Sequence, residues 1–348
     1  MAQPQITRTD IRLALPSKGR LQSGTLEFLS HCGFDVKQSA TRGYVGSISN
    51  LPTANGDNVT VIFQRPRDIV ISVANGGVDF GITGFDVVQE ASVASQVHFL
   101  HDALGFGKCK LVVAVPEKWD VRNMADLARV SADWATAGKP LRVATVFPQI
   151  TRNFLQQHNL PNFQIVEAEG SLEVLPEINA ADCIADIVET GNTLTQNRLR
   201  AIEDGLMLTT QASLIANRDA IQRPDVLQVA TTMLEYIEAH LRAEKFLMVI
   251  ANIRGQSAED VAHKLHTQTT LGGLQGPTIA PIYANSNTPK DSGWFGITLM
   301  VKRNELTGAI DQLRRVGGSG VIVTPVAYVF EEQPDRVAAL KGRISNGE

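Results

Sequence analysis

Apolar residues follow two alternating periodicities along most of the chain. Short runs rich in Val, Ile, Leu and Phe are typical of strands, and segments with an apolar residue every three to four positions are typical of helices. The expected strands are Ile11–Pro16, Val59–Gln64, Asp79–Thr83, Lys110–Val115, Leu141–Val146, Phe163–Ala168, Ile184–Val188 and Leu206–Ala216. The expected helices are Leu21–His31, Arg67–Asn75, Gln149–His158 and Leu172–Asn179. This alternation predicts an α/β fold with mostly parallel, helix-covered sheets.

The strand–helix pattern forms two successive blocks, which predict two α/β lobes with a cleft between them. We expect the first lobe to comprise residues 1–106 and 206–244, and the second to comprise residues 107–205. A long helix follows from Pro224 to about Lys245, with proline in its first turn as helix starts favour and one apolar face.

Residues 245–348 form the third expected domain. Its strands and helices are expected at Phe246–Asn252, Ser257–His266, Thr278–Ala284, Trp294–Val301, Glu305–Val316 and Gly320–Phe330. Ser257 followed by Asp260 resembles a capping box. The order β-α-β-β-α-β predicts a ferredoxin-like domain, which by analogy is often a ligand sensor. The first ten residues and those after about Glu331 are expected to be mobile ends.

Composition narrows the class of protein. With 348 residues, 43% apolar and 20% charged, the chain is typical of a soluble protein of two or three domains. Its net charge of -4 and lack of a basic tract argue against nucleic acid and anionic membranes as partners. Three scattered cysteines, an N-terminus without an apolar core and no run of about 20 apolar residues predict a cytoplasmic protein without disulfides, structural zinc or a membrane span.

The strongest chemical signal is the segment Cys183–Leu194, CIADIVETGNTL. An apolar strand ends in an acidic residue, and a turn with two hydroxyls then opens a helix, where backbone N–H groups favour phosphate. Carboxylates beside a phosphate suit a ribose diol or Mg²⁺, so the segment predicts a site for phosphoribosyl pyrophosphate (PRPP). The residues concerned are Asp186, Glu189, Thr190, Gly191, Asn192 and Thr193. An ordinary helix cap is the alternative interpretation.

Basic residues follow two other expected strands. Lys18 and Arg20 flank Gly19 after the first strand, and Arg65 and Arg67 follow the strand Val59–Gln64. The carboxyl ends of strands are where α/β sheets bind ligands, and Arg grips two phosphate oxygens at once. Each pair is equally consistent with a solvated surface turn.

The segment Asp79–Asp86, DFGITGFD, is a further candidate, with Thr83, Gly84 and Asp86 at a strand end and a tight turn as the alternative. Cys109 is expected to be a small buried residue rather than a nucleophile. The sequence contains no GxSxG, Walker A or GxGxxG after the first strand, which argues against a serine hydrolase, a P-loop NTPase and a Rossmann dehydrogenase.

The ordered set of motifs resembles the long form of the ATP phosphoribosyltransferase family across nearly the whole chain. The matching segments are LPSKGRL, RPRDI, GGVDFGITGFD, GFGKCKLVVAVP, RVATVFP, EGSLEVLP, ADCIADIVETGNTL, KFLMVIANI, GLQGPTIAPI and GVIVTPV. The resemblance implies transfer of the phosphoribosyl group of PRPP to N1 of ATP, the first step of histidine biosynthesis. It also implies two lobes resembling periplasmic binding proteins, Mg²⁺ dependence, inhibition by histidine at the C-terminal domain, and a cytoplasmic homo-hexamer in exchange with a dimer.

The resemblance also implies roles for individual residues. Residues 190–193 would bind the 5′-phosphate with Asp186 near the ribose, and the four basic residues would face ATP or pyrophosphate. Thr83, Gly84 and Asp86 would line the other side of the cleft. The positions that match effector contacts are Asn252, Leu274, Gly276, Thr278 and Gly320. Some relatives carry a carboxylate at Asn252, which would pair with an ammonium group, and a serine at Gly276.

Three other functions compete with this interpretation. Two α/β lobes could form a solute-binding protein, the phosphate turn could serve transfer to a different acceptor, and the chain could be an inactive regulatory subunit. The acidic phosphate turn argues against a solute-binding protein, and the appended ferredoxin-like unit argues against a different acceptor. The presence of Lys18 and Arg20 argues against an inactive subunit.

Overall fold

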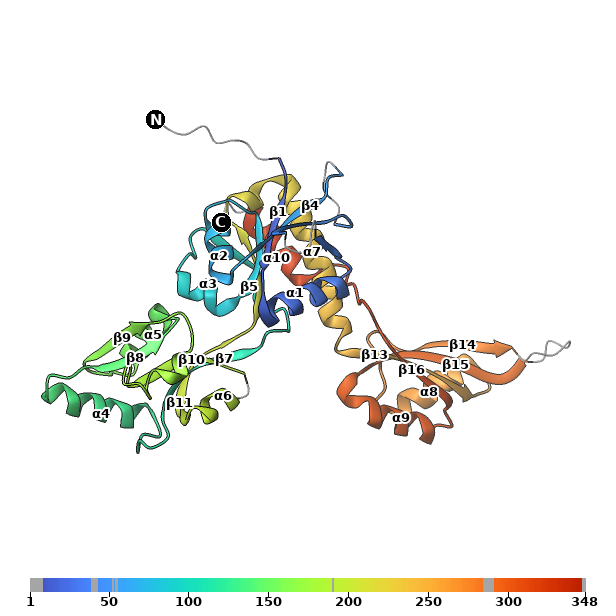
Figure 1. Cartoon of the computed structure of the whole chain (residues 1–348). Helices are drawn as coiled ribbons and strands as arrows, with labels where there is room; N and C mark the ends of the chain where they lie inside the picture. Colours follow the sequence, from blue (N-terminus) through green and yellow to red (C-terminus); the bar gives the residue numbers. More distant parts are fainter. Residues whose placement is uncertain are drawn as a thin grey trace. The chain divides into compact units, whose positions relative to one another are not determined.

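The computed structural model describes residues 9–38, 43–51, 53, 56–189, 191–283 and 291–345 (Figure 1). The chain divides into two compact units, Met1–Leu234 with Ala339–Glu348 and Glu235–Ala338. The three domain ranges expected from the sequence stay a prediction.

The first unit contains a seven-stranded sheet in the order β2-β3-β4-β1-β5-β12-β6. Its strands are β1 (Arg12–Pro16), β2 (Val36–Gln38), β3 (Val45–Ile48), β4 (Val59–Gln64), β5 (Phe80–Gly84), β6 (Val97–His101) and β12 (Ala212–Asn217). The helices α1 (Gly19–His31), α2 (Pro66–Ala74) and α3 (Phe85–Ala91) connect them. Together these elements form lobe I. Its core includes Leu13, Ile69 and Phe80, all with no exposed surface.

A five-stranded sheet in the order β11-β7-β10-β8-β9 forms lobe II of the same unit. Its strands are β7 (Cys109–Pro116), β8 (Leu141–Thr145), β9 (Phe163–Glu167), β10 (Cys183–Val188) and β11 (Leu199–Thr210). The helices of this lobe are α4 (Met124–Thr136), α5 (Pro148–Gln157) and α6 (Asn192–Gln196). A core that includes Val113, Leu127, Leu141 and Cys183 lies between the sheet and its helices.

Both sheets are mixed, so the expectation of mostly parallel sheets was wrong. In lobe I, β1 runs parallel to β4 and β5, whereas the remaining neighbours are antiparallel. In lobe II, β10 and β9 run parallel to β8, whereas β7 is antiparallel to both β10 and β11. The antiparallel pairs arise partly because the chain passes between the lobes twice, once before β7 and once after β11.

The expected strand Leu206–Ala216 is two strands in different sheets, β11 and β12, which separate at Gln211. The return into lobe I is held by backbone hydrogen bonds from Ala212 N to Phe106 O (3.0 Å) and from Leu104 N to Ala212 O (2.9 Å). The sequence contains no glycine or proline at this break, so its apolar run gave no sign of it. The strands β2, β3 and β6 were also not expected.

The expected helix Leu172–Asn179 was wrong as well. Only a 3₁₀ turn, Leu172–Val174, forms there, and hydrogen-bonded turns follow it. Pro176 has no N–H to continue a helix, and Asn179 adopts a left-handed conformation with φ of 58°.

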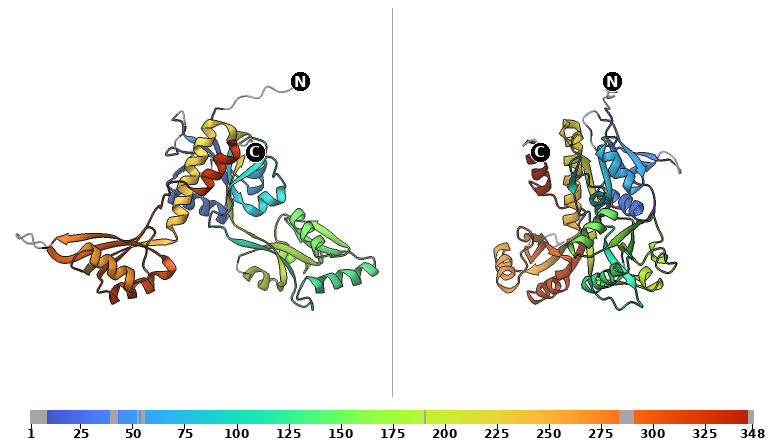
Figure 2. Two further views of the ribbon diagram at one scale, coloured as in Figure 1. Left: turned by 180° about the vertical axis from the view of Figure 1, so that it is seen from behind. Right: turned by 90° about the vertical axis from the view of Figure 1, so that its left-hand side faces the viewer.

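The second unit contains the expected ferredoxin-like fold. Its elements are β13 (Phe246–Arg254), α8 (Ala258–Gln268), β14 (Thr278–Tyr283), β15 (Asp291–Lys302), α9 (Leu306–Arg315) and β16 (Ser319–Pro325). The sheet order β14-β15-β13-β16 has only antiparallel neighbours, and α8 and α9 cover one face (Figures 1 and 2). The hydroxyl of Ser257 accepts from Asp260 N at 3.2 Å and caps α8 as expected. The predicted fold class, two α/β lobes with a ferredoxin-like domain, is confirmed.

The long helix α7 (Pro224–Ala243) forms as predicted, with one buried face. The chain end differs from expectation, because residues after Glu331 include the helix α10 (Asp335–Ser345). Val337 and Leu340 of α10 are buried, and Arg336 pairs with Glu238 of α7 at 3.0 Å. The expected mobile N-terminus lies mostly outside the described residues.

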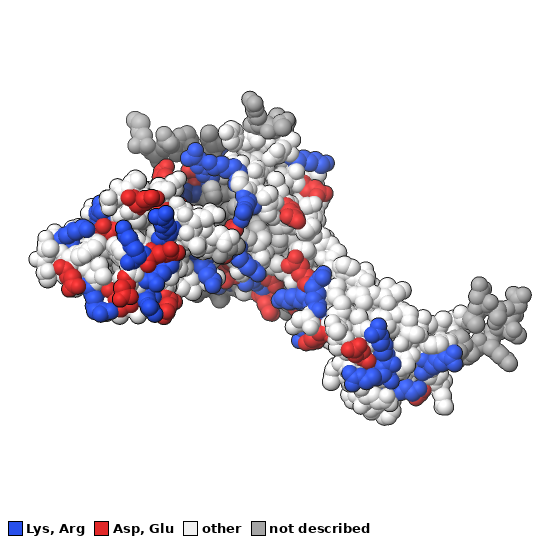
Figure 3. Space-filling view, turned by 60° about the horizontal axis from the view of Figure 1, so that its bottom comes forward, with Lys and Arg blue, Asp and Glu red and all other residues white. Residues whose placement is uncertain are grey.

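Charged side chains of both signs are interspersed on the face drawn in Figure 3. This distribution matches the small net charge of -4. Over the described part of the chain, no helix has the length and apolar character of a membrane span.

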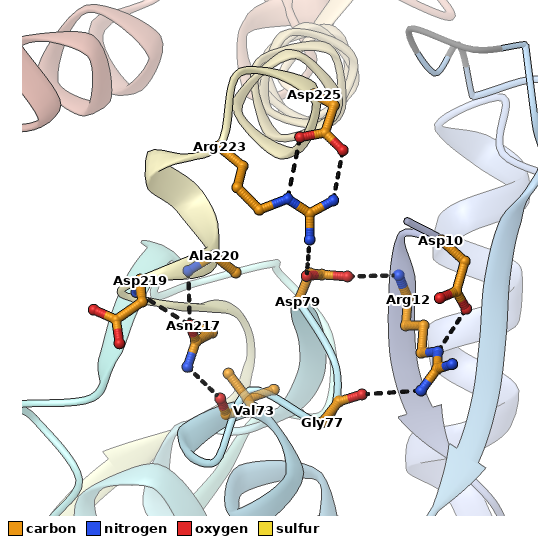
Figure 4. A network of polar contacts seen from close by, with 10 residues as sticks. All are labelled: Asp10, Arg12, Val73, Gly77, Asp79, Asn217, Asp219, Ala220, Arg223 and Asp225. Carbon is orange, nitrogen blue, oxygen red and sulfur yellow. Dashed lines mark hydrogen bonds and ion pairs between the residues drawn. The ribbon is translucent and has the colours of Figure 1, made fainter. Parts of the chain in front are cut away.

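A polar network holds the amino-terminal edge of the sheet in lobe I (Figure 4). The fully buried carboxylate of Asp79 accepts from Arg12 N at 2.8 Å and lies 3.7 Å from the guanidinium of Arg223. Asp225, in the first turn of α7, binds the same guanidinium through two contacts of 3.2 and 2.5 Å. The Asn217 side chain joins the end of β12 to Val73 O at 2.8 Å. The opposite, carboxyl edge carries the candidate site.

Candidate functional site

The basic candidates of lobe I lie on adjacent loops, because β1 and β4 are parallel neighbours that end side by side. Pro16 pairs with Gln64, and Ser17 N donates to Gln64 O at 2.8 Å. Gly19 has a φ of 74°, which glycine adopts without strain. The four cations are exposed at the starts of α1 and α2, at Lys18, Arg20, Arg65 and Arg67.

The acidic turn of lobe II lies at the carboxyl edge of its own sheet. Gly191 adopts a φ of 82° as the N-cap of α6, so Asn192 and Thr193 form the first turn of a helix of only five residues. Thr190 lies outside the described residues. Asp186, near the end of β10, accepts from Ile187 N at 2.7 Å. The turn therefore has the helix-opening geometry that the sequence predicted for a phosphate cradle.

Residues of the two lobes contact one another at these edges. Arg20 of lobe I forms an ion pair with Glu189 of lobe II, and the Arg67 guanidinium donates to Val146 O. The Glu90 carboxylate accepts from Gln149 N and Ile150 N at 2.8 and 3.0 Å. Three candidates from separate motifs, Arg20, Arg67 and Glu189, thus take part in contacts between the two lobes. Glu90 was not expected, since a lone glutamate in a helix carries no sequence signal.

Thr83, Gly84 and Asp86 lie at the same edge of lobe I but are buried. The Thr83 hydroxyl donates to Pro66 O at 3.2 Å, and a Cβ at Gly84 would lie 2.3 Å from an oxygen of Asp86. Asp86 accepts from the Thr210 hydroxyl at 2.8 Å while its own N–H donates back to that oxygen at 3.0 Å. Burial raises the pKa of Asp86, and the hydrogen bond from Thr210 opposes that shift. This geometry favours shaping of the edge over direct contact with a ligand.

Cys109 is expected to be unreactive towards thiol reagents in the folded protein at neutral pH. Burial first, and then the charges of Asp86 and Glu189, raise the pKa of its thiol to about 12. The nucleophilic thiolate is therefore scarce. Iodoacetamide labelling followed by peptide mass analysis would check this. The urea-unfolded chain is the control, and rapid native labelling of Cys109 would contradict the expectation.

Asp186 is expected to lower the stability of the protein at neutral pH. Burial, and in addition the charge of Glu173, raise the pKa of Asp186 from 3.8 to about 6. Its contribution to stability is therefore complete below pH 3.8 and lost as the pH rises through about 6. We expect Asp186→Asn to raise the free energy of unfolding by about 1–3 kcal/mol near pH 8, but by little near pH 4. Urea unfolding of the wild type and Asp186→Asn in metal-free buffer at both pH values tests this. Equal free energies of unfolding of the two proteins at pH 8 would contradict it.

The effector candidates fall into two groups in the ferredoxin-like unit. Leu274, Gly276 and Thr278 line a hollow of about 1040 Å³, together with residues that include Arg242 and Phe330. Gly276 has a φ of 104°, so a serine there would be strained.

Asn252 and Gly320 do not line this hollow. Asn252 pairs across the sheet with Gly296 and Ser319. A Cβ at Gly320 would lie 3.4 Å from Asn252 Nδ2. Asn252, Thr278 and Gly320 lie on strands of one sheet, and Leu274 and Gly276 lie in the segment before β14, so only three of the five positions share the hollow.

The chain is similar to ATP phosphoribosyltransferases over most of its length. A model of the ATP phosphoribosyltransferase family matches residues 65–239, and one for the C-terminal domain of HisG matches residues 243–328. ATP phosphoribosyltransferase 2, chloroplastic, from Arabidopsis thaliana is 40% identical over 97% of this chain and 82% of its own length. The enzyme of Rhodopseudomonas palustris strain HaA2 is 36% identical over 92% of this chain and 94% of its own length.

Among solved structures, the ATP phosphoribosyl transferase (HisG:HisZ) complex from Thermotoga maritima aligns with 66% of this chain and 98% of its own chain, at 22% identity and a TM-score of 0.49. The periplasmic aliphatic sulphonate binding protein SsuA from Escherichia coli aligns with 66% of this chain and 73% of its own, at 14% identity and a TM-score of 0.41.

Proposed function

This chain belongs to the ATP phosphoribosyltransferase family, and we propose that it transfers the phosphoribosyl group of PRPP to N1 of ATP, releasing pyrophosphate, as the first step of histidine biosynthesis. The observation that carries the proposal is the contact between Arg20 and Glu189. This contact joins the basic start of α1 in lobe I to the turn before α6 in lobe II. PRPP carries a pyrophosphate and a 5′-phosphate on one ribose, so its binding requires a basic site and a phosphate-binding turn close together.

The residues act mainly by binding and orientation. Thr190, Gly191, Asn192 and Thr193 bind the 5′-phosphate, and Asp186 accepts a hydrogen bond from a ribose hydroxyl. Lys18, Arg20, Arg65 and Arg67 neutralise the triphosphate of ATP and the departing pyrophosphate. Adenine N1 carries no proton in its neutral form, so its attack on the anomeric carbon, with inversion, requires no strong base. Catalysis then rests on positioning and on stabilising an oxocarbenium-like ribose.

Mg²⁺ is the cofactor of this proposal. Asp186 and Glu173 are close enough for the charge of Glu173 to raise the pKa of Asp186, and such oxygen donors suit Mg²⁺. Within the described residues, no three His, Cys, Asp or Glu side chains gather as a metal site, so phosphate oxygens and water would complete the coordination. When bound, the ion would neutralise charge on the pyrophosphate.

Histidine is the proposed inhibitor, and the hollow lined by Leu274, Gly276 and Thr278 is its proposed site. Arg242, which also lines the hollow and pairs with Glu331 at 2.8 Å, would exchange that partner for the carboxylate of an amino acid. Asn252 and Gly320, on other strands of the sheet that contains Thr278, would act from outside the hollow. A homo-hexamer in exchange with a dimer, in the cytoplasm, completes the proposal, although the Arabidopsis relative is named chloroplastic.

Pyrophosphate release tests this function directly. The purified chain is incubated with PRPP, Mg²⁺ and ATP, with and without millimolar histidine, while pyrophosphatase removes the product. We expect pyrophosphate release with ATP but not with adenine or GTP as the acceptor. We expect histidine to lower the rate of release. ATP-dependent release that ignores histidine would reject the inhibitor site alone. No release with any acceptor would favour a binding protein.

A further inference from the structure

Helix α5 of lobe II begins without a cap from its own residues, as far as the described chain shows. Its N-cap residue is Phe147, which has no side-chain oxygen, and its first helical residue is Pro148, which has no N–H. The next two N–H groups, of Gln149 and Ile150, have no partner within the helix because they belong to its first turn. Such groups require an acceptor from elsewhere.

Glu90 of lobe I supplies that acceptor. One of its carboxylate oxygens accepts from Gln149 N at 2.8 Å and the other from Ile150 N at 3.0 Å. The carboxylate also lies at the positive end of α5, so its charge and its hydrogen bonds act together. Side chains usually cap a helix from the residue just before it. Here the two partners are 59 and 60 positions apart in the sequence and belong to different sheets.

The segment that Glu90 binds is also held by a cation of the same lobe. Arg67 donates to Val146 O, immediately before Phe147. Two charged side chains of lobe I thus bind one turn of lobe II. The Glu90 carboxylate accepts from its N–H groups, and the Arg67 guanidinium donates to its carbonyl. This turn follows β8, which is the parallel neighbour of β10, where Thr145 pairs with Ala185, the residue before Asp186. Fixing the turn therefore fixes the strand edge that carries the candidate PRPP site.

At its other end, α3 is tied to the strand that returns to lobe I. Asp86, in the first turn of α3, exchanges two hydrogen bonds with Thr210 at the end of β11. Glu90 lies one turn further along the same short helix. A helix fixed at one end to the crossover and at the other to α5 resists opening of the lobes about the two connecting strands.

We propose that Glu90 is a positioning residue that holds the two lobes in the arrangement that binds both substrates, by capping α5 across the lobes. The proposal rests on the phosphoribosyl transfer proposed above. Glu90 would touch no reacting atom. Loss of two hydrogen bonds to a charged acceptor is enough to shift a two-state opening equilibrium about tenfold or more.

The test compares Glu90→Ala and Glu90→Gln with Gln89→Ala, a control at the exposed neighbouring position of the same helix. For Glu90→Ala we expect the KM values for PRPP and ATP to rise about tenfold while kcat stays within about twofold, because saturating substrates restore closure. Glu90→Gln keeps one acceptor oxygen and should give an intermediate KM. Gln89→Ala should match the wild type.

Hydrogen exchange of residues 146–151 provides a readout that needs no turnover, and we expect it to be faster in Glu90→Ala. Faster exchange with unchanged KM would overturn the proposal, because the cap would then serve α5 alone. A fall in KM would also overturn it, since it would mean that Glu90 occupies N–H groups needed by a substrate anion. Unchanged exchange would reject the cap itself. A wild-type chain without activity would instead reject the proposed function, so the two failures are distinguishable.

Discussion

Replacement of Arg20 by alanine is expected to lower kcat/KM for pyrophosphate release by about 100-fold, the scale of the loss when one hydrogen-bond donor to a transition state is removed. The Arg20 side chain is 87% exposed and its only ion pair among the described residues is with Glu189 across the lobes. An exposed pair of this kind contributes little to folding. The loss should therefore appear in steady-state kinetics, measured by coupled pyrophosphate detection, with the thermal midpoint nearly unchanged.

Arg129→Ala is the matched control for this prediction. Arg129 is also an exposed arginine in an ion pair, with Asp126 in α4 of lobe II, and it belongs to none of the proposed contacts. Wild-type kinetics in Arg20→Ala would contradict its role. A double-mutant cycle with Glu189→Gln tests whether the two residues act through their ion pair. Additive losses would mean that each residue acts on the substrate independently, whereas non-additive losses would mean that they act together.

The position of the candidate site was largely predictable, whereas the contacts within it were not. Lys18, Arg20, Arg65 and Arg67 follow strands, and parallel strands end at one edge, so a local rule placed them together. Glu90 was beyond such a rule, since its partners are backbone N–H groups of a turn in another sheet. No residue type or spacing in the sequence marks an interaction of that kind.

In the fold, too, elements bounded by local sequence signals were predicted, and those set by contacts distant in the sequence were not. The ferredoxin-like unit was predicted element by element, because each of its strands and helices is bounded by its own turn residues. The passage from β11 to β12 was missed because the apolar run Leu206–Ala216 continues across it. What divides that run is its pairing, with Cys109 of β7 at Thr210 and with Gly84 of β5 at Ala212. For Thr83 and Asp86, whose contact with a ligand stays a prediction, the sequence showed their polarity but not their internal partners Pro66 and Thr210.

Replacement of Asp79 by alanine is expected to lower the free energy of unfolding of the unit that contains lobe I by about 1–3 kcal/mol. The Asp79 carboxylate has no exposed surface and joins Arg12 N to the guanidinium of Arg223 (Figure 4). Its removal leaves a buried N–H without an acceptor and a half-buried cation with one fewer partner. Urea unfolding followed by circular dichroism measures the loss.

Asp10→Ala provides the control. Asp10 also binds Arg12, through the guanidinium rather than the backbone N–H, but its side chain is 39% exposed, so its loss should cost less than about 1 kcal/mol. Equal stabilities of Asp79→Ala and Asp10→Ala would contradict the prediction. Kinetics below the unfolding transition add a second condition. Asp79 precedes β5, whereas Thr83 and Asp86 lie at and beyond its carboxyl end, so the network is separated from the proposed site by the length of the strand. The folded fraction of Asp79→Ala should therefore keep the wild-type kcat, and a lowered kcat in fully folded protein would mean that the two edges of the sheet are coupled.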